Sequence, residues 1–225
     1  MNGQKLVSLA IRLLVLVIVA AVIVSFILAS VNKDSPQDTI RVACVGDSIT
    51  QSSVYPYELS LQLGKQSYSV SNFGVGSTTV SLDSEIAYIN TTAFQDALQF
   101  QPDIVIIMLG TNDAKPSLHR YNTSFVKDYT QLVAAFQNLA SKPEIWIALP
   151  PPIFSNQFGT VSSEYLANTL IPCIEQVANE NSLPLIDVYS ALVSYSEHFY
   201  DGVHPDVEGG KLIAEEIYKA LKPTL

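Results

Sequence analysis

Two stretches of the 225-residue chain could together form a nucleophile with its acid–base partners. Ser48 lies in the segment GDSIT, directly after the apolar segment RVACV. A glycine before it permits a tight turn, which would hold the serine near a helix start where backbone N–H groups stabilise negative charge. Asp201 precedes His204 in DGVHP, and at this spacing the carboxylate can fix the imidazole tautomer. Taken singly, the serine also fits a turn or helix cap, and the histidine a surface loop.

Two further segments could donate hydrogen bonds to the same reaction. The segment NFGVGSTT contains Gly76 and Ser77, whose small size would let the backbone approach a ligand, although an ordinary glycine-rich turn has the same composition. Asn112 lies in GTND after the apolar segment IVIIML. Its amide could stabilise an oxyanion, or it could cap the next segment. A nucleophile, a base, an orienting acid and oxyanion donors are the groups that acyl transfer requires.

These residues can act together only if the fold brings their segments to one place. The hydrophobic pattern predicts five strands, at Ile40–Val45, Tyr68–Asn72, Ile104–Leu109, Ile145–Leu149 and Leu185–Val188. It predicts helices at about Tyr55–Leu63, Thr92–Phe100, Ser124–Leu139, Ser162–Asn181 and Val207–Leu221. Strands interleaved with helices indicate right-handed crossovers and a mainly parallel sheet covered on both faces. Ligands bind such sheets at the carboxyl ends of the strands, where three of the four motifs begin.

The four motifs together resemble those of one enzyme family. GDSIT, NFGVGSTT, GTND and DGVHP occur in the order and approximate spacing of the SGNH hydrolases, also called GDSL esterases, and the resemblance covers nearly all of residues 40–222. It implies a flavodoxin-like three-layer α/β/α sandwich with a five-stranded, mainly parallel sheet. It also implies that Ser48 is the nucleophile, that His204 is the base with Asp201 behind it, and that Asn112 donates through its side chain.

The resemblance leaves one oxyanion donor open. The family usually has a glycine five residues after the asparagine of the second motif, and this chain has Ser77 there, with Gly76 just before it. Either backbone N–H could act beside that of Ser48. A Cβ at this position keeps the N–H but narrows the pocket.

The resemblance implies a serine esterase that needs no metal or organic cofactor. The residues agree, because neither cysteine has a CxxC partner and the three histidines are dispersed. No long insertion between the predicted strands would build a deep acyl tunnel, which favours a short acyl group, such as acetyl, on a carbohydrate or similar alcohol. A lysophospholipase or thioesterase is the alternative within the family. An inactive, membrane-tethered binding module is the alternative outside it, since a fold alone does not establish function.

An apolar segment precedes the predicted domain. Leu13–Ala29 is a run of 17 residues without a charge, close to the length of about 20 that spans a bilayer. Lys5 and Arg12 precede it, so the positive-inside rule puts the N-terminus in the cytoplasm and the rest outside. We therefore expect three parts: an anchor or signal segment at 1–30, a linker at 31–39 and the hydrolase domain at 40–225. A cleaved signal peptide, which would make the protein secreted, is the alternative.

The charge of the chain limits its partners. Without residues 1–30 it carries 10 basic and 21 acidic residues, a net charge of −11, which argues against nucleic acid or anionic lipid head groups. Cys44 lies in a predicted strand and Cys173 in a predicted helix, so we expect two separately buried thiols rather than a disulfide. Asn90 and Asn122 begin glycosylation sequons, which matter only in a host that glycosylates them.

Overall fold

The structure is a computed structural model that describes Ile18, residues 39–154 and residues 160–224. Its described part contains a five-stranded sheet in the order β2-β1-β3-β4-β5, and every neighbouring pair of strands is parallel. The strands are β1 (Ile40–Gly46), β2 (Tyr68–Gly74), β3 (Ile104–Met108), β4 (Glu144–Ala148) and β5 (Leu185–Ile186). The predicted α/β architecture with a parallel sheet is therefore confirmed.

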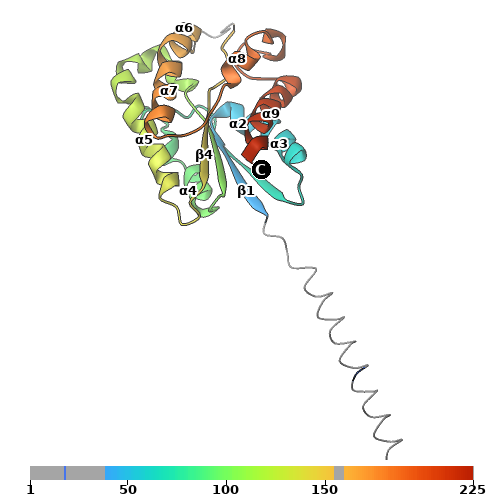
Figure 1. Cartoon of the computed structure of the whole chain (residues 1–225). Helices are drawn as coiled ribbons and strands as arrows, with labels where there is room; N and C mark the ends of the chain where they lie inside the picture. The colour runs from blue at the N-terminus through green and yellow to red at the C-terminus, as the bar shows by residue number, and fades with distance from the viewer. Residues whose placement is uncertain (1–17, 19–38, 155–159, 225) are drawn as a thin grey trace, which may run out of the picture. The chain divides into compact units, whose positions relative to one another are not determined.

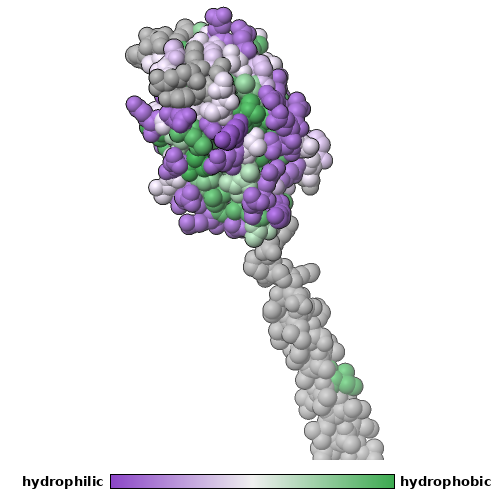
Figure 2. Space-filling view, turned by 90° about the vertical axis from the view of Figure 1, so that its left-hand side faces the viewer, coloured by the Kyte–Doolittle hydropathy of each residue, from purple (hydrophilic) through white to green (hydrophobic). Residues whose placement is uncertain are grey.

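Helices cover both faces of this sheet (Figure 1). One face packs against α4 (Thr92–Gln99), α5 (Asn122–Gln137) and α7 (Ile171–Glu180). The other packs against α3 (Tyr55–Leu63) and α9 (Val207–Leu221). The outer surface on the side of α4, α5 and α7 carries hydrophilic residues around smaller hydrophobic areas (Figure 2). The shorter segments are α2 (Ser48–Ser52), η2 (Tyr88–Asn90), η3 (Asn112–Ala114), η4 (Pro116–Tyr121), α6 (Ser163–Tyr165), η5 (Leu166–Leu170), α8 (Val188–Leu192), η6 (Ser196–His198) and η7 (Lys222–Thr224).

Two hydrophobic cores lie on opposite faces of the sheet. In β1, Ala43 and Val45 belong to one core and Val42 and Cys44 to the other, because successive strand side chains point to opposite faces. Every residue of β3 is buried, which explains why its sequence shows no alternation. Each such aliphatic side chain contributes about 1.5–3 kcal/mol through burial, so the central strands form a rigid base for the loops that follow them.

The sheet brings three of the motifs together at the carboxyl ends of neighbouring strands. Gly46 at the end of β1 lies opposite Gly74 of β2 and Met108 of β3. Adjacent strands are about 4.8 Å apart. The loops that begin with GDSIT, NFGVG and GTND therefore leave the same edge of the sheet as immediate neighbours.

Several predicted elements differ from the structure by one or two residues at their ends, and two differ for a clear physical reason. The helix expected at Ser162–Asn181 consists of α6, the π-helical turn η5 and α7. Pro172 lies in the first turn of α7, and because proline has no N–H the preceding backbone widens. The strand expected to reach Val188 ends at Ile186, since Asp187 caps α8 by accepting a hydrogen bond from Ser190 N.

The N-terminal predictions concern residues that the structure leaves almost entirely undescribed. The anchor and the linker lie outside the described residues, apart from Ile18 and Thr39. None of the described helices combines the length and the hydrophobicity needed to cross a bilayer. Both cysteines are free as expected, and Cys44 is buried, whereas Cys173 is only half-buried.

Candidate active site

A continuous hydrogen-bonded chain joins Ser48, His204 and Asp201. Ser48 Oγ lies 2.8 Å from His204 Nε2, and His204 Nδ1 lies 2.7 Å from Asp201 Oδ2. A carboxylate accepts but does not donate, so it selects the tautomer with the proton on Nδ1. His204 Nε2 is then free to accept the proton of the Ser48 hydroxyl. Residues 156 positions apart in the sequence thus form a nucleophile–base pair.

The loop between η6 and α9 holds Asp201 as a carboxylate. Its Oδ1 accepts hydrogen bonds from the backbone N–H groups of Val203 (2.9 Å) and His204 (2.7 Å). Partial burial raises the pKa of Asp201, but these two bonds and the His204 side chain outweigh it and hold the pKa below its usual value. The acid is therefore ionised at neutral pH and can stabilise an imidazolium at His204.

A glycine and an aromatic residue fix the shape of this loop. Gly202 has a φ of +84°, which a residue with a Cβ rarely adopts, and its N–H donates to Phe199 O in a turn. The Gly202 carbonyl in turn accepts a hydrogen bond of 2.9 Å from Phe154 N, just beyond β4. The rings of Phe154 and Phe199 pack with centroids 5.0 Å apart. The histidine loop is thus attached to the segment that follows the fourth strand.

The turn before Ser48 requires glycine. A Cβ on Gly46 would lie 2.0 Å from Thr50 Oγ1 and 2.7 Å from Met108 O, so no side chain fits. Asp47 caps α2 by accepting a hydrogen bond of 2.9 Å from Ile49 N. Ser48 is consequently the first residue of α2, and its own N–H donates to none of the described residues.

Asp47 itself is an unusual cap because it is buried. Its Oδ2 has no hydrogen-bond partner among the described residues. Burial raises its pKa to about 6, against the lowering effects of the Ile49 N–H, the nearby Thr111 hydroxyl and the charge of His204. A buried carboxyl with a raised pKa therefore lies directly before the nucleophile in the chain.

The glycine-rich loop after β2 is tightly joined to α2. Asn72 Nδ2 donates to Thr50 O at 2.8 Å, and a Cβ on Gly74 would lie 2.2 Å from Gln51 N. The N–H of Gly76 donates to Gln51 Oε1 at 2.9 Å. A Cβ on Gly76 would lie 3.9 Å from Ser48 Cβ, so this loop passes directly beside the nucleophile.

These contacts distinguish Gly76 from Ser77, the two candidates for the second backbone oxyanion donor. The Gly76 N–H is engaged by Gln51, whereas the Ser77 N–H has no acceptor among the described residues. Ser77 has a φ of +64°, in the left-handed region that favours glycine. The conformation thus explains why glycine would suit this position, and Ser77 adopts it nevertheless.

Asn112 reaches the same loop from the end of β3. Its Nδ2 donates to Thr78 O at 3.1 Å, which uses one of two amide hydrogens and leaves the other for a ligand. The neighbouring Asp113 accepts hydrogen bonds from Val80 N (2.9 Å), Ser81 N (2.9 Å) and Ser81 Oγ (2.7 Å). Burial raises the pKa of Asp113 to about 6, although these bonds lower it. Asn112 and Asp113 therefore hold the loop that carries Ser77.

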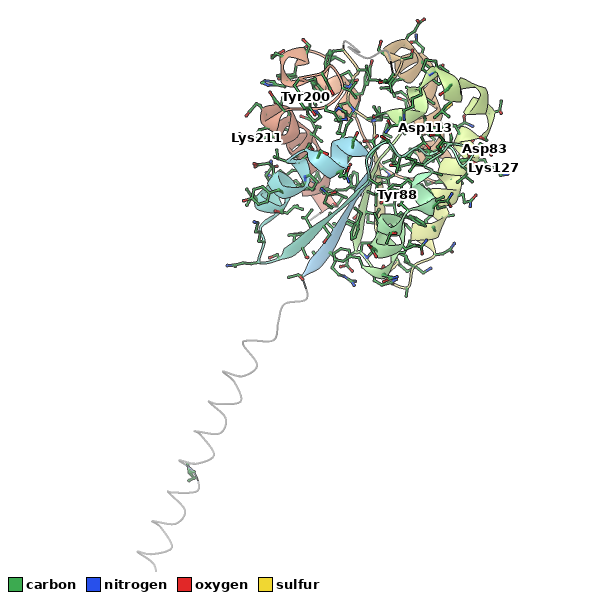
Figure 3. The ribbon with its side chains drawn as sticks, turned by 180° about the vertical axis from the view of Figure 1, so that it is seen from behind. Asp83, Tyr88, Asp113, Lys127, Tyr200 and Lys211 are labelled. Carbon is green, nitrogen blue, oxygen red and sulfur yellow. The ribbon has the colours of Figure 1, made fainter. Side chains whose placement is uncertain are left out.

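Every residue expected at the site lies in this region, and several others take part without having been assigned a site role from the sequence. Figure 3 shows Asp113 inside the domain, between Tyr200 on one side and Asp83 on the other. The exposed Tyr200 ring stacks on the His204 imidazole, with centroids 6.0 Å apart and an angle of 20°. Gln51 follows Ser48 by three residues in α2 and so shares its helix face, which is the signal that could have identified it.

The sequence matches a known family over most of its length. Residues 44–212 match the model of the GDSL-like lipase/acylhydrolase family. An acetylxylan esterase from Xylanibacter ruminicola is 34% identical over 212 residues, which cover 83% of this chain and 44% of that protein. A GDSL esterase/lipase, CPRD49, from Arabidopsis thaliana is 24% identical over 142 residues, covering 54% of this chain and 55% of that protein. The chain thus spans about half the length of the curated relatives it matches.

Solved structures share the fold. A carbohydrate acetylesterase family member from Sinorhizobium meliloti superposes with a TM-score of 0.64 at 23% identity, covering 83% of this chain and 97% of that one. The inhibitor-bound aryl esterase of M. smegmatis superposes with a TM-score of 0.69 at 20% identity, covering 83% of this chain and 100% of that one. At these identities the likeness concerns the fold.

Proposed function

Because the chain belongs to the GDSL-like lipase/acylhydrolase family, we propose that it is a serine esterase whose catalytic triad is Ser48, His204 and Asp201. The observation that carries the proposal is the hydrogen-bonded chain from Ser48 Oγ through both nitrogens of His204 to Asp201. A nucleophile in contact with a base, and a base oriented by an ionised acid, is the arrangement that activates a serine.

In the proposed reaction, Ser48 Oγ attacks the carbonyl carbon of an ester while His204 Nε2 takes the hydroxyl proton. Asp201 stabilises the resulting imidazolium through the 2.7 Å bond to Nδ1. The tetrahedral intermediate collapses as His204 returns the proton to the leaving alcohol. Water then attacks the acyl-enzyme by the same route and releases the acid and the free serine.

Three donors would hold the oxyanion: the N–H of Ser48, the N–H of Ser77 and Nδ2 of Asn112. We choose Ser77 over Gly76 because the Gly76 N–H already donates to Gln51 Oε1. The two backbone groups have no competing acceptor among the described residues, and Asn112 retains one amide hydrogen. Removing a single donor of this kind typically costs about 100- to 1,000-fold in turnover.

The substrate we propose is a short-chain ester, most simply an acetyl ester of a carbohydrate or similar alcohol. The relatives support this choice, because one is named an acetylxylan esterase and one solved structure is named as a carbohydrate acetylesterase. A lysophospholipase or thioesterase activity is the alternative, and hydrolysis rates that rise with acyl chain length would favour it. A non-enzymatic binding module is the remaining alternative.

We also propose that residues 1–30 hold the domain at a membrane, with the domain on the extracytoplasmic side. The uncharged run Leu13–Ala29 and the preceding Lys5 and Arg12 support this arrangement. In cells that express the full chain, we expect the protein in the salt-washed membrane fraction, with its domain cleaved by protease added outside the cells. Recovery of a shortened chain from the medium would instead indicate a cleaved signal segment.

The decisive experiment is labelling with a fluorophosphonate probe, combined with hydrolysis of 4-nitrophenyl acetate. We expect the wild-type protein to be labelled at Ser48. Ser48→Ala should lose labelling and at least about 1,000-fold in turnover, and Asn112→Ala about 100-fold. Ser52→Ala, at the exposed end of the same helix, is the matched control and should behave as the wild type. A folded wild-type protein that neither reacts with the probe nor hydrolyses the ester would establish the binding-module alternative.

A further inference from the structure

A polar cleft begins at Ser77, one of the two loop-borne oxyanion donors. We define the Ser77–Lys115 cleft as the cavity of about 420 Å³ whose polar lining includes Ser77, Asp83, Ser84, Glu85, Lys115 and Ser117. One wall is the chain after Ser77. The other begins three residues after Asn112, and Lys115 N donates to Asn112 O at 3.2 Å. Each wall is therefore continuous along the chain with one donor. Ser77 itself lines the cleft, and a Cβ on the preceding Gly76 would lie 3.9 Å from Ser48 Cβ, so this end of the cleft is close to the nucleophile.

The cleft is too large to serve an acetyl group alone. A methyl group is about as large as a water molecule, whose share of liquid volume is about 30 Å³. A volume of about 420 Å³ instead falls within the range of sites that enclose whole small molecules. If the acyl group is acetyl, the remainder of the substrate is the alcohol, and only the alcohol is large enough to fill the cleft.

The charges in the cleft select the kind of alcohol. Asp83 and Glu85 supply two carboxylates and Lys115 one ammonium group, and none of the three forms an ion pair with a described residue. Their net charge of −1 disfavours a phosphate-bearing head group through like-charge repulsion. An alkyl chain would remove these charged groups from water without replacing their hydrogen bonds. The hydroxyl groups of a neutral sugar can both donate to the carboxylates and accept from the ammonium group.

The wall that carries Asp83 and Glu85 is held in place before any ligand binds. Asp113 accepts three hydrogen bonds from Val80 and Ser81, and Asp128 of α5 accepts one of 3.0 Å from Leu82 N. Beyond the two acidic residues, Thr79 N donates to Ile86 O at 3.1 Å and closes the loop on itself. A preformed wall lowers the entropic cost of binding.

We propose that the Ser77–Lys115 cleft is the subsite for the sugar of an O-acetylated neutral oligosaccharide, bound through Asp83, Glu85 and Lys115. This inference rests on the proposed esterase function and adds to it the place and the chemistry of alcohol recognition. It assigns a role to three charged residues outside the triad and the oxyanion site.

The test compares two acetyl esters. For each variant we take the ratio of kcat/KM for acetylated xylo-oligosaccharides to kcat/KM for 4-nitrophenyl acetate, whose alcohol is too small and too apolar to use the charged groups. Asp83→Asn, Glu85→Gln and Lys115→Met should each lower this ratio about tenfold, mainly through KM for the oligosaccharide. Lys142→Met and Asp96→Asn are matched controls that should keep the ratio, since Lys142 precedes β4 at the opposite edge of the sheet and Asp96 lies on the exposed side of α4.

The outcomes separate the subsite from the esterase function. Ratios within twofold of the wild type in all three cleft variants would overturn the subsite, as would a wild-type enzyme that hydrolyses 4-nitrophenyl acetate but not the oligosaccharide. Equal losses on both esters would also overturn it, because they indicate damage to the oxyanion loop. Failure of the wild type on both esters, without fluorophosphonate labelling, would instead refute the esterase function. Thermal unfolding of every variant identifies those that fail to fold. The folded cleft variants then decide whether the cleft is the sugar subsite.

Discussion

Replacing Gln51 with leucine should lower kcat about tenfold while changing the free energy of unfolding by only about 1 kcal/mol. The hydrogen bond from Gly76 N to Gln51 Oε1 lies at the surface, so water can replace the lost oxygen. A bond of this kind contributes about 0.5–1.5 kcal/mol net. Leucine has no polar atom and is one atom shorter than glutamine, so it removes the acceptor and leaves its place open to water.

The expected loss of turnover follows from the position of that bond. Gln51 engages the N–H immediately before that of Ser77 and so determines which amide faces the site. Complete loss of an oxyanion donor costs about 2.7–4 kcal/mol. A loop that keeps the Ser77 N–H but no longer fixes its direction should lose about a third to a half of this, and 1.4 kcal/mol corresponds to a factor of ten.

The assay measures kcat and KM for 4-nitrophenyl acetate together with urea unfolding. Gln51→Glu retains an oxygen at the same place, but its charge would lie within a few ångströms of the site, so all variants are compared at 1 M salt, where the Debye length is only about 3 Å. Under these conditions glutamate should keep more of kcat than leucine does. Our reasoning is refuted if Gln51→Leu retains wild-type kcat or if glutamate is as slow as leucine. It is also refuted if the leucine variant loses several kcal/mol of stability.

Two further predictions concern residues close to Ser48. Ser77→Gly should relieve about 1–2 kcal/mol of left-handed strain in the folded protein, where φ is +64°. It should also stabilise the unfolded chain by about 0.4–1 kcal/mol, because glycine has more conformational freedom there. The free energy of unfolding, measured in urea, should then rise by about 0 to 1.6 kcal/mol, and kcat should change by less than about threefold. A large loss of kcat would mean that the serine side chain takes part in the reaction. Asp47→Asn removes a carboxyl whose pKa burial raises to about 6, and such a group costs stability as pH rises from about 4 to 6. The variant should therefore exceed the wild type by up to about 3 kcal/mol at pH 8 and by little at pH 4, and a difference independent of pH would contradict this.

Elements with unambiguous local signals could be predicted closely from the sequence. The helix at Val207–Leu221 has the bounds expected of it. Its apolar residues recur at helical spacing, and Asp206 caps its first turn by accepting from Gly209 N at 2.8 Å. The buried strand Ile104–Met108 was equally clear, because six consecutive apolar residues follow a turn.

Elements with competing signals were less predictable. In Leu185–Val188 the apolar pattern favours a strand, but an aspartate within it can also cap a helix, and the cap prevails at Asp187. In the long helix at Ser162–Asn181, one proline changes the geometry of a turn that periodicity alone describes as regular. Hydrophobic periodicity shows which residues are apolar, but it does not show that proline lacks a backbone N–H.

The candidate site shows the same division. The types and spacing of Ser48, Asp201 and His204 indicated a triad, and the structure places the three in hydrogen-bond contact. The choice between Gly76 and Ser77 could not be made from the sequence, because it depends on a side chain 25 residues earlier in the chain. Such a contact exists only once β1 and β2 are paired.

Gly74 bears on how this protein could be modified. Its Cα lies so close to the backbone of Gln51 that a single added carbon would come within 2.2 Å of the Gln51 nitrogen. The nucleophile segment and the glycine-rich segment are therefore in direct backbone contact, with no room for a further atom between them. In a chimaera with a relative, residues 46–51 and 72–77 should therefore be exchanged together, because exchanging one segment alone would change only one side of this contact.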